Sequence, residues 1–256
     1  MLLLNDGMAS DSAAMLASSC AVVVAPLELV DESHLALLDV NERRRRSDIV
    51  IESDRARFTL GAVLLRLVVA RQLGVDAKTL AIDRTCDSCG ASHGRPRLTA
   101  CGLHASISHS GDLVAVALTA AGAVGIDIEQ IMDRDVEALA AVACAPTERT
   151  AITSSSAFHT CWTRKEAVLK ALACGLRTAP SDVVVSAAGR PPRVVTIEGR
   201  PPSGIQMFDL PVATGYAGAL AVLSDEPISL TMCDPSVLLA TGSARRRARA
   251  RCCYGP

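Results

Sequence analysis

Two short stretches of this sequence carry side chains that could do metal-dependent phosphate chemistry. The first is AVGIDIEQI, residues 123–131, whose residues alternate as in a strand, so that Asp127 and Glu129 point from the same face. Two adjacent carboxylates repel each other, and holding both ionised needs a cation between them. Such oxygen ligands favour a hard ion, Mg²⁺ or Mn²⁺. An edge strand with a polar outer face would show the same pattern, so this stretch leaves both interpretations open.

The second stretch is FHTCWTRKEAVLKALACGL, residues 158–176, which predicts a helix that ends near Gly175. Glu166 and Lys170 are four residues apart on it, so their charged groups can meet. The chain has 23 arginines and only three lysines, yet it places Lys165 and Lys170 in this one helix. Lysine is a compact point charge where arginine is a planar fork. We interpret Glu166 as a third carboxylate for the ion and Lys170 as a contact to a phosphate. The alternative is an ordinary surface pair, worth about 0.3–0.5 kcal/mol.

The rest of the chain predicts the elements that must position these groups. Apolar residues recur at helical spacing over residues 53–75, with Ser53 as the expected N-cap and Gly74 as the stop. A short helix is expected at residues 135–143. Strands are predicted at residues 21–29, 113–120, 123–131, 182–188, 193–199, 205–211 and 216–224.

The composition restricts the class of protein. Half of the residues are hydrophobic and the formal net charge is −1, so no overall field steers the chain toward nucleic acid or membrane. The ten cysteines lack the spacing of a disulfide framework, which predicts a reducing cytoplasm. No basic segment opens the chain, and no apolar run reaches the roughly 20 residues of a membrane helix. We therefore expect neither a signal peptide nor a membrane span.

Four motifs occur in an order that resembles one enzyme family. Residues 94–96 read GRP, residues 106–110 read SISHS, residues 125–129 read GIDIE and residues 162–170 read WTRKEAVLK. Together they resemble the 4′-phosphopantetheinyl transferases, in particular the longer, two-lobed type that activates carrier proteins of peptide, polyketide or fatty-acid synthesis. The resemblance covers about residues 20–230.

This resemblance implies a fold and a reaction. The implied fold is α+β, with two similar lobes that each pack a small, mostly antiparallel sheet with helices and hold a ligand cleft between them. The lobes are expected at residues 17–121 and 122–235, after a loose leader of residues 1–16 and before an arginine-rich, disordered tail of residues 236–256. The implied reaction moves 4′-phosphopantetheine from coenzyme A to a serine of an apo carrier protein and leaves adenosine 3′,5′-bisphosphate. The partner would be an acidic, helical carrier protein, and the enzyme a cytoplasmic monomer.

The resemblance also implies roles for single residues. Asp127, Glu129 and Glu166 would hold Mg²⁺, with Mn²⁺ as an alternative. Either Glu166 or a water on the ion would take the proton from the attacking serine. Lys170 would contact the leaving phosphate, with Lys165 nearby as a second contact.

The remaining expected contacts are to coenzyme A. Ser108 and His109 would hydrogen-bond its phosphates, although His109 could instead be an ordinary core histidine. Arg46 and Arg57 are the candidates for the 3′-phosphate, which suits a bidentate guanidinium. Arg95 would lie beside the nucleotide.

Two other functions and one further metal site remain open at this point. A metal-dependent phosphohydrolase could use the same carboxylates. A nucleic-acid-binding module could use the five arginines of residues 245–251, although few aromatic side chains are present to stack on bases. Cys86, Cys89 and His93 form half of a zinc site, which Cys101 or His104 could complete.

Overall fold

The computed structural model describes residues 16–86, 89–92, 94–98, 101–133, 135–173 and 178–240, and it confirms an α+β fold. The helices are α2 (Val40–Asp48), α3 (Glu52–Leu73), α4 (Val136–Ala143), α5 (Pro146–Arg149) and α6 (Ser155–Leu172), with 3-10 turns η1 (Leu27–Leu29), η2 (Glu32–Leu37), η3 (Ala77–Thr79) and η5 (Pro180–Asp182). The strands are β1 (Ser19–Pro26), β2 (Ile82–Asp83), β3 (Arg97–Leu98), β4 (His104–Ser110), β5 (Leu113–Thr119), β6 (Val124–Gln130), β7 (Val183–Val185), β8 (Val194–Ile197), β9 (Ile205–Asp209), β10 (Tyr216–Leu223) and β11 (Ser229–Cys233).

These strands form two main sheets and a small ribbon. The first sheet has the order β11-β1-β5-β4-β3-β2, and the second has the order β6-β10-β9. Strands β7 and β8 pair separately. All pairings are antiparallel except that of β1 with β11, so the mostly antiparallel sheets predicted from the sequence are present.

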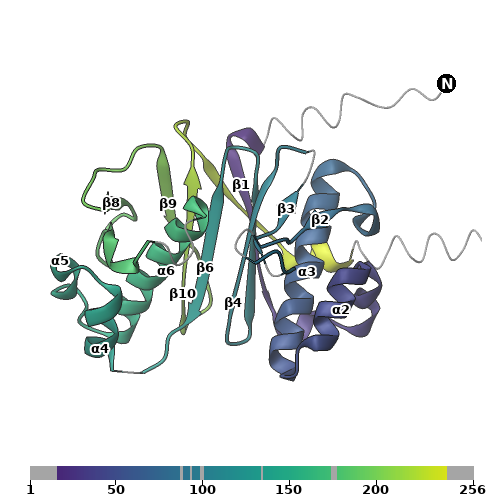
Figure 1. The fold of residues 1–256 in the computed structure, drawn as a ribbon, viewed down its shortest axis with the longest axis horizontal. Coiled ribbons are helices and arrows are strands. Elements are labelled where there is room, and N and C mark those ends of the chain that lie inside the picture. The colour runs from purple at the N-terminus through teal and green to yellow at the C-terminus, as the bar shows by residue number, and fades with distance from the viewer. Residues whose placement is uncertain are drawn as a thin grey trace, which may run out of the picture.

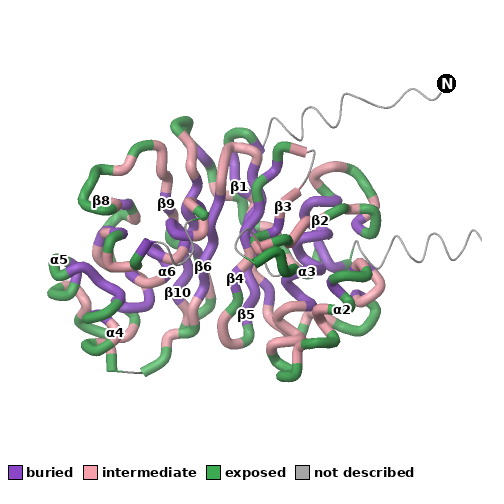
Figure 2. The backbone as a smooth tube through the Cα atoms, viewed as in Figure 1, coloured by how far each residue is buried: buried purple, intermediate pink, exposed green. Residues whose placement is uncertain are grey.

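The two sheets lie face to face between two long helices (Figure 1). Leu64 of α3 and Val116 of β5 belong to the core on the outer side of the first sheet. Ile126 and Ile128 of β6 are fully buried in a second core between the sheets, as their alternation with the carboxylates predicts. Val168 of α6 belongs to a third core on the far side of the second sheet. The strands between the helices are accordingly largely buried (Figure 2).

Alternating serines on β4 join the two sheets. The hydroxyl oxygens of Ser106, Ser108 and Ser110 accept hydrogen bonds from the backbone N–H groups of Ile126, Ile128 and Gln130, at 3.1, 3.3 and 3.1 Å. Strand β6 is an edge of its own sheet, so these donors have no strand partner on that side. The period of two in the SISHS motif therefore matches the period of a strand and satisfies the edge of the neighbouring sheet.

Gly125 lets α6 lie unusually close to β6. A Cβ atom added to this glycine would come within 1.9 Å of the Ala167 carbonyl oxygen and 2.5 Å of the Ala171 nitrogen. Both are backbone atoms, so they could not give way without moving the helix. The glycine of the GIDIE motif thus fixes the distance between the strand that carries the paired carboxylates and the helix that carries Glu166 and Lys170.

The structure corrects some expected boundaries. Helix α3 begins at Glu52 and its N-cap is Ile51, not Ser53, whereas Gly74 does end it in a left-handed conformation. Residues 229–240, expected in the second lobe and the tail, return to the first sheet. There β11 pairs with β1, and Leu238 and Leu239 belong to the α3 core. The leader of residues 1–15, Gly175 and residues 241–256 lie outside the described residues.

Candidate active site

A cavity of about 540 Å³ lies where the two sheets and the two long helices meet. Its acidic side comes from β6 and α6, and its basic side comes from α2, α3 and the chain just after β2. The charged residues that line it are Asp127, Glu129, Glu166, Lys170, Arg45, Arg57 and Arg84, joined by Ser108, His109, Phe58 and Trp162. The cavity therefore combines most of the residues that the two motif stretches predicted.

Lys170 lies at the centre of the acidic side of the cavity. Its ammonium nitrogen donates to Asp127 Oδ1 at 2.7 Å, to Ser108 Oγ at 3.1 Å and to the Ile126 carbonyl at 3.0 Å. Ser108 Oγ in turn donates to the same Asp127 oxygen at 2.8 Å. A residue from each of β4, β6 and α6 thus meets at one carboxylate, although these residues are far apart in the sequence.

The other two carboxylates face the same cavity. Glu129 accepts a hydrogen bond from Ser110 Oγ at 2.6 Å. Burial raises the pKa of Glu166, and the negative charges of Asp127 and Glu129 raise it further, against the opposing effect of Lys170. The carboxylates therefore repel one another, and the raised pKa of Glu166 is the result of this repulsion together with burial.

The residues fit a hard divalent ion in chemistry. Asp127 Oδ2 is buried and has no hydrogen-bond partner among the described residues, which leaves a carboxylate oxygen free to ligate. All three candidate ligands are oxygens, as Mg²⁺ and Mn²⁺ prefer. The three carboxylates are less closely gathered than the sequence analysis expected. Within the described part of the chain, only one group of three possible metal ligands has all its ligand atoms within 4.8 Å of one another. That group is Cys144, Glu148 and Cys161, not the three carboxylates of the cavity.

Three arginines form the basic side of the cavity. Arg57 donates from Nε to the Gly111 carbonyl at 2.7 Å and is paired with Asp54 at 2.6 Å. Arg45 lies over the Phe58 ring, 5.1 Å from its centre. Arg84 is the least satisfied of the three, because its buried Nε has no hydrogen-bond partner among the described residues.

Burial lowers the pKa of Arg84 to about 10. This value still leaves the guanidinium positively charged at neutral pH. A half-buried cation whose buried Nε is an unused donor, beside an open cavity, is suited to an anionic ligand.

His109 also lines the cavity and is exposed. Partial desolvation, with the positive charges of Arg57 and Lys170, lowers its pKa. The imidazole is therefore neutral at neutral pH and can donate or accept a hydrogen bond. The alternative of an ordinary core histidine does not describe this position.

Lys165 does not reach the cavity, contrary to the expectation from the sequence. It is fully buried, and its ammonium nitrogen donates to Glu148 Oε2 at 2.6 Å, to the Pro180 carbonyl at 3.0 Å and to the Val183 carbonyl. The physical reason is helical spacing: Lys165 and Lys170 are five positions apart, so they project from different faces of α6. Through its hydrogen bond to Pro180, Lys165 stabilises the η5 turn, and Pro180 borders the cavity.

Two expected arginines also lie outside the cavity lining. Arg46 donates to Thr59 Oγ1 at 3.1 Å, and its neighbour Arg45 faces the cavity instead. Arg95 is exposed and its charge acts on His104. A run of four arginines gives no indication of which one faces inward, and Arg84 lies in a loop without periodicity, so sequence reasoning missed both Arg45 and Arg84.

One buried ion pair of α6 was not predicted from the sequence. Arg164 is fully buried and binds both Asp209 oxygens at 2.8 and 2.5 Å, which ties α6 to β9.

Of the expected zinc ligands, Cys86 and Cys89 are described, but His93 lies outside the described residues, so that site stays a prediction.

Residues 123–221 match the family model of the 4′-phosphopantetheinyl transferase superfamily. This part of the chain is therefore similar to a domain of that superfamily. The chain is also 31% identical over 152 residues to a curated protein of Nostoc sp. (strain PCC 7120 / SAG 25.82 / UTEX 2576), the 4′-phosphopantetheinyl transferase HetI. The aligned part covers 55% of this chain and 62% of that relative, which is less than two thirds of its length. The matched residues contain the three carboxylates and Lys170, whereas the arginines of the basic side precede them.

Proposed function

We propose that this protein transfers 4′-phosphopantetheine from coenzyme A to a serine of an apo carrier protein, releasing adenosine 3′,5′-bisphosphate. The observation that carries the proposal is the cavity itself. In a chain that is similar to the transferase superfamily, it sets a cluster of carboxylates opposite three arginines. Coenzyme A carries a pyrophosphate and a separate 3′-phosphate, so its binding site must accommodate several negative charges at two positions.

Glu166 is the group that we assign to the proton of the acceptor serine. Burial and the neighbouring carboxylates raise its pKa, so it holds a proton more readily than an exposed glutamate. A general base works best when its pKa approaches the working pH. Lys170, fixed by Asp127 and Ser108, is assigned to the leaving phosphate, where its positive charge would stabilise the charge that develops.

Asp127, Glu129 and Glu166 would hold Mg²⁺, and the free Asp127 oxygen is the structural feature that fits this role best. When bound, the ion would neutralise charge on the pyrophosphate and polarise its phosphorus–oxygen bonds. Lys170 occupies the other Asp127 oxygen at 2.7 Å, so the lysine and the ion would share this carboxylate from two sides.

The basic side of the cavity would bind the phosphates of coenzyme A. Arg57 keeps its place from the sequence prediction, and Arg45 and Arg84 replace Arg46 and Arg95. Arg84 is the strongest candidate for an anion because its buried Nε has no partner among the described residues. Ser108 and the neutral His109 would supply hydrogen bonds between the two charged sides.

The partner is expected to be an acidic, helical carrier protein, and we propose a monomer that works in the cytoplasm. None of the described helices combines the length and the apolar character needed to cross a membrane.

The decisive experiment incubates the protein with coenzyme A, Mg²⁺ and a panel of apo carrier proteins, and follows the intact carrier mass. One added phosphopantetheine is expected, and it should be absent when the acceptor serine is replaced by alanine or when the metal is chelated. A mixture without carrier should leave coenzyme A intact. Consumption of coenzyme A in that mixture would instead support the phosphohydrolase.

Glu166→Gln tests the assigned base in the same assay. It keeps the size of the side chain and should lower the transfer rate by more than tenfold, since general bases contribute about 10²–10⁴. Glu137→Gln, on the exposed face of α4, is the matched control and should keep the full rate. If the Glu166 variant retained more than about a tenth of the rate, a loss of under roughly 1.4 kcal/mol, the assignment would be wrong.

A further inference from the structure

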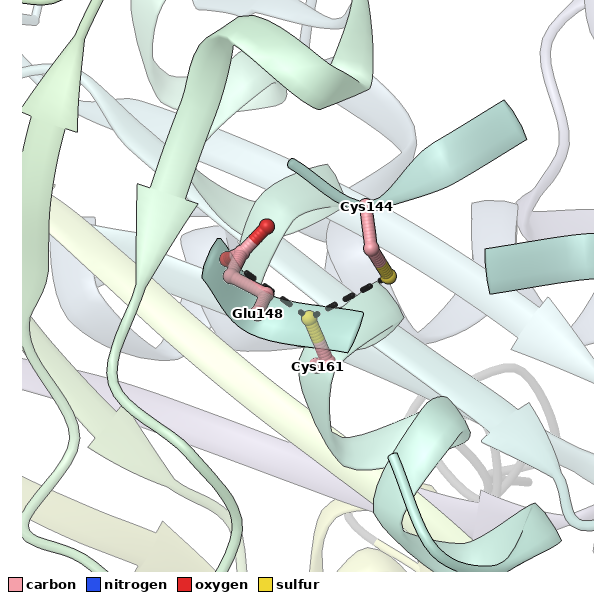
Figure 3. Close-up of side chains that lie close together, drawn as sticks. All are labelled: Cys144, Glu148 and Cys161. Atoms are coloured by element: carbon pink, nitrogen blue, oxygen red, sulfur yellow. Dashed lines mark hydrogen bonds between the residues drawn. The ribbon is translucent and has the colours of Figure 1, made fainter. Parts of the chain in front are cut away.

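A pair of buried thiols joins α4 to α6, the helix that contributes to the acidic side of the cavity. Cys144 caps α4 and Cys161 lies in α6, and their sulfur atoms are 3.8 Å apart (Figure 3). Both residues are almost completely buried, with 0% and 3% of their surface exposed. Their side chains face each other across the junction of two helices, and no function assigned above uses them.

A second cavity gives access to this pair. It has a volume of about 290 Å³, is bordered by α5, β7 and β8, and includes Cys161 in its wall. A molecule of a few atoms, such as hydrogen peroxide, fits within that volume. One thiol of the pair therefore borders a space that a small oxidant can enter, although both side chains are shielded from bulk solvent.

Glu148 lies beside the two thiols and forms a cluster with them. It is not available to complete a metal site. Its Oε1 accepts from the Val185 N–H at 2.8 Å and from the Cys161 thiol at 3.8 Å. Its Oε2 accepts from Lys165 at 2.6 Å and from the Ala145 N–H at 2.8 Å.

The ammonium group of Lys165 would also repel a cation brought to that oxygen. A structural zinc site needs four ligands, and only these three are gathered here among the described residues. The geometry therefore favours chemistry between the two sulfurs.

We infer that Cys144 and Cys161 are a redox-modification site that a small peroxide converts to a disulfide in the folded protein. One thiolate attacks a peroxide oxygen, an S–O bond forms, the O–O bond breaks, and the released hydroxide takes a proton to become water. The second thiolate attacks this sulfenic sulfur, the S–S bond forms, the S–O bond breaks, and a second water leaves. Two thiols thus lose two protons and two electrons, and one peroxide becomes two waters.

The electrostatics of the cluster favour one thiolate in the pair. The hydrogen bond from Cys161 lowers the pKa of Cys144, and the positive charge of Lys165 acts in the same direction against burial. The same hydrogen bond and burial raise the pKa of Cys161. One sulfur is therefore favoured as a thiolate beside a neutral partner. The sulfurs must approach from 3.8 Å to about 2.05 Å to form the bond.

The test treats the reduced, full-length protein with hydrogen peroxide under native conditions, blocks remaining thiols with N-ethylmaleimide, and digests with trypsin. Cleavage after the arginines separates residues 135–149, which contain Cys144, from residues 150–164, which contain Cys161. Mass spectrometry should find these two peptides linked as the main oxidation product, and dithiothreitol should separate them. Recovery of both peptides unlinked, or a link from either one to another cysteine as the main product, would overturn the inference.

Two controls keep the result specific. Cys101→Ala removes a thiol outside the pair and should leave the link unchanged, whereas Cys161→Ala should abolish it. If Cys161→Ala fails to fold, the peptide experiment on the unaltered protein still decides, because it needs no variant. Bound zinc in the native protein, in one equivalent that protects both thiols from peroxide, would assign the cluster to a metal and also overturn the inference.

Discussion

Helix α6 carries two lysine–carboxylate clusters that differ in their surroundings. Lys170 binds Asp127 at the edge of the 540 Å³ cavity, and 31% of the lysine side chain is exposed. Lys165 binds Glu148 beside the third core, where the lysine side chain is 0% exposed and both Glu148 oxygens already have donors. The first cluster leaves an Asp127 oxygen without a partner among the described residues, and the second leaves none on Glu148.

This difference shows that motif membership does not assign a role. Both lysines belong to the WTRKEAVLK motif and both have a carboxylate at hydrogen-bond distance. One cluster is open and incompletely satisfied, which suits binding and chemistry. The other is closed and fully satisfied, which suits holding helix, strand and turn together. Four variants can break or sharpen this comparison.

The largest expected effect is on the closed cluster. Lys165→Met leaves the Glu148 carboxylate buried without its cation, and should lower the free energy of unfolding by about 3–5 kcal/mol. Urea unfolding measures it, with Lys78→Met on the exposed η3 turn as a control that should change stability by less than about 0.5 kcal/mol. Lys170→Met should lose less stability than Lys165→Met, because the Lys170 side chain is partly exposed and the Lys165 side chain is fully buried. Equal losses would erase the distinction between the clusters.

The next effect is on the open cluster and concerns rate. Lys170→Arg keeps the positive charge but replaces a point charge that three acceptors surround by a planar group. We expect the transfer rate to fall by about 100-fold, or ~2.7 kcal/mol, with the fold retained. Lys78→Arg is the matched control for the exchange. Near-normal transfer by Lys170→Arg would show that the open cluster needs only a charge.

A smaller effect tests whether the open cluster extends to the basic side of the cavity. Arg84→Gln removes a cation with a buried, unused donor, and should raise the KM for coenzyme A by about tenfold, or ~1.4 kcal/mol, with little change in kcat. Arg71→Gln, in the last turn of α3 and exposed, should leave KM unchanged. An unaltered KM in the Arg84 variant would show that this arginine of the basic side does not contribute to the binding of coenzyme A.

The smallest effect is a pH-dependent gain of stability. The pKa of Glu166 is raised in the folded protein above its ordinary value of 4.5. Its contribution to stability is therefore fully present below pH 4.5 and is lost as the pH rises through the folded pKa. Glu166→Gln should thus be more stable than the unaltered protein at neutral pH, by less than about 1 kcal/mol, and equally stable in acid. Unfolding in chelator at both pH values measures it, and a less stable variant at neutral pH would contradict the assigned repulsion.

The carboxylates were predictable because their signal is local. Period two placed Asp127 and Glu129 on one strand face and the isoleucines in the core, and the structure confirms that division. The basic side was harder to predict. Only one of the three arginines predicted to bind coenzyme A, Arg57, lines the cavity, because a run of four arginines and a loop carry no periodicity that tells inward from outward.

The return of β11 to the first sheet was also missed. Its pairing with β1 joins segments from opposite ends of the chain, and no local pattern encodes such a contact.

The sequence by itself determined the α+β class, the strand and helix that carry the acidic groups, and the resemblance to one enzyme family, because these depend on side-chain periods and on residue types at short spacing. Only the tertiary structure decided which lysine of α6 faces the cavity, which arginines lie opposite it, and that two cysteines 17 positions apart face each other. Those outcomes depend on how closely helices and sheets approach, which is set by contacts such as that of Gly125 with α6.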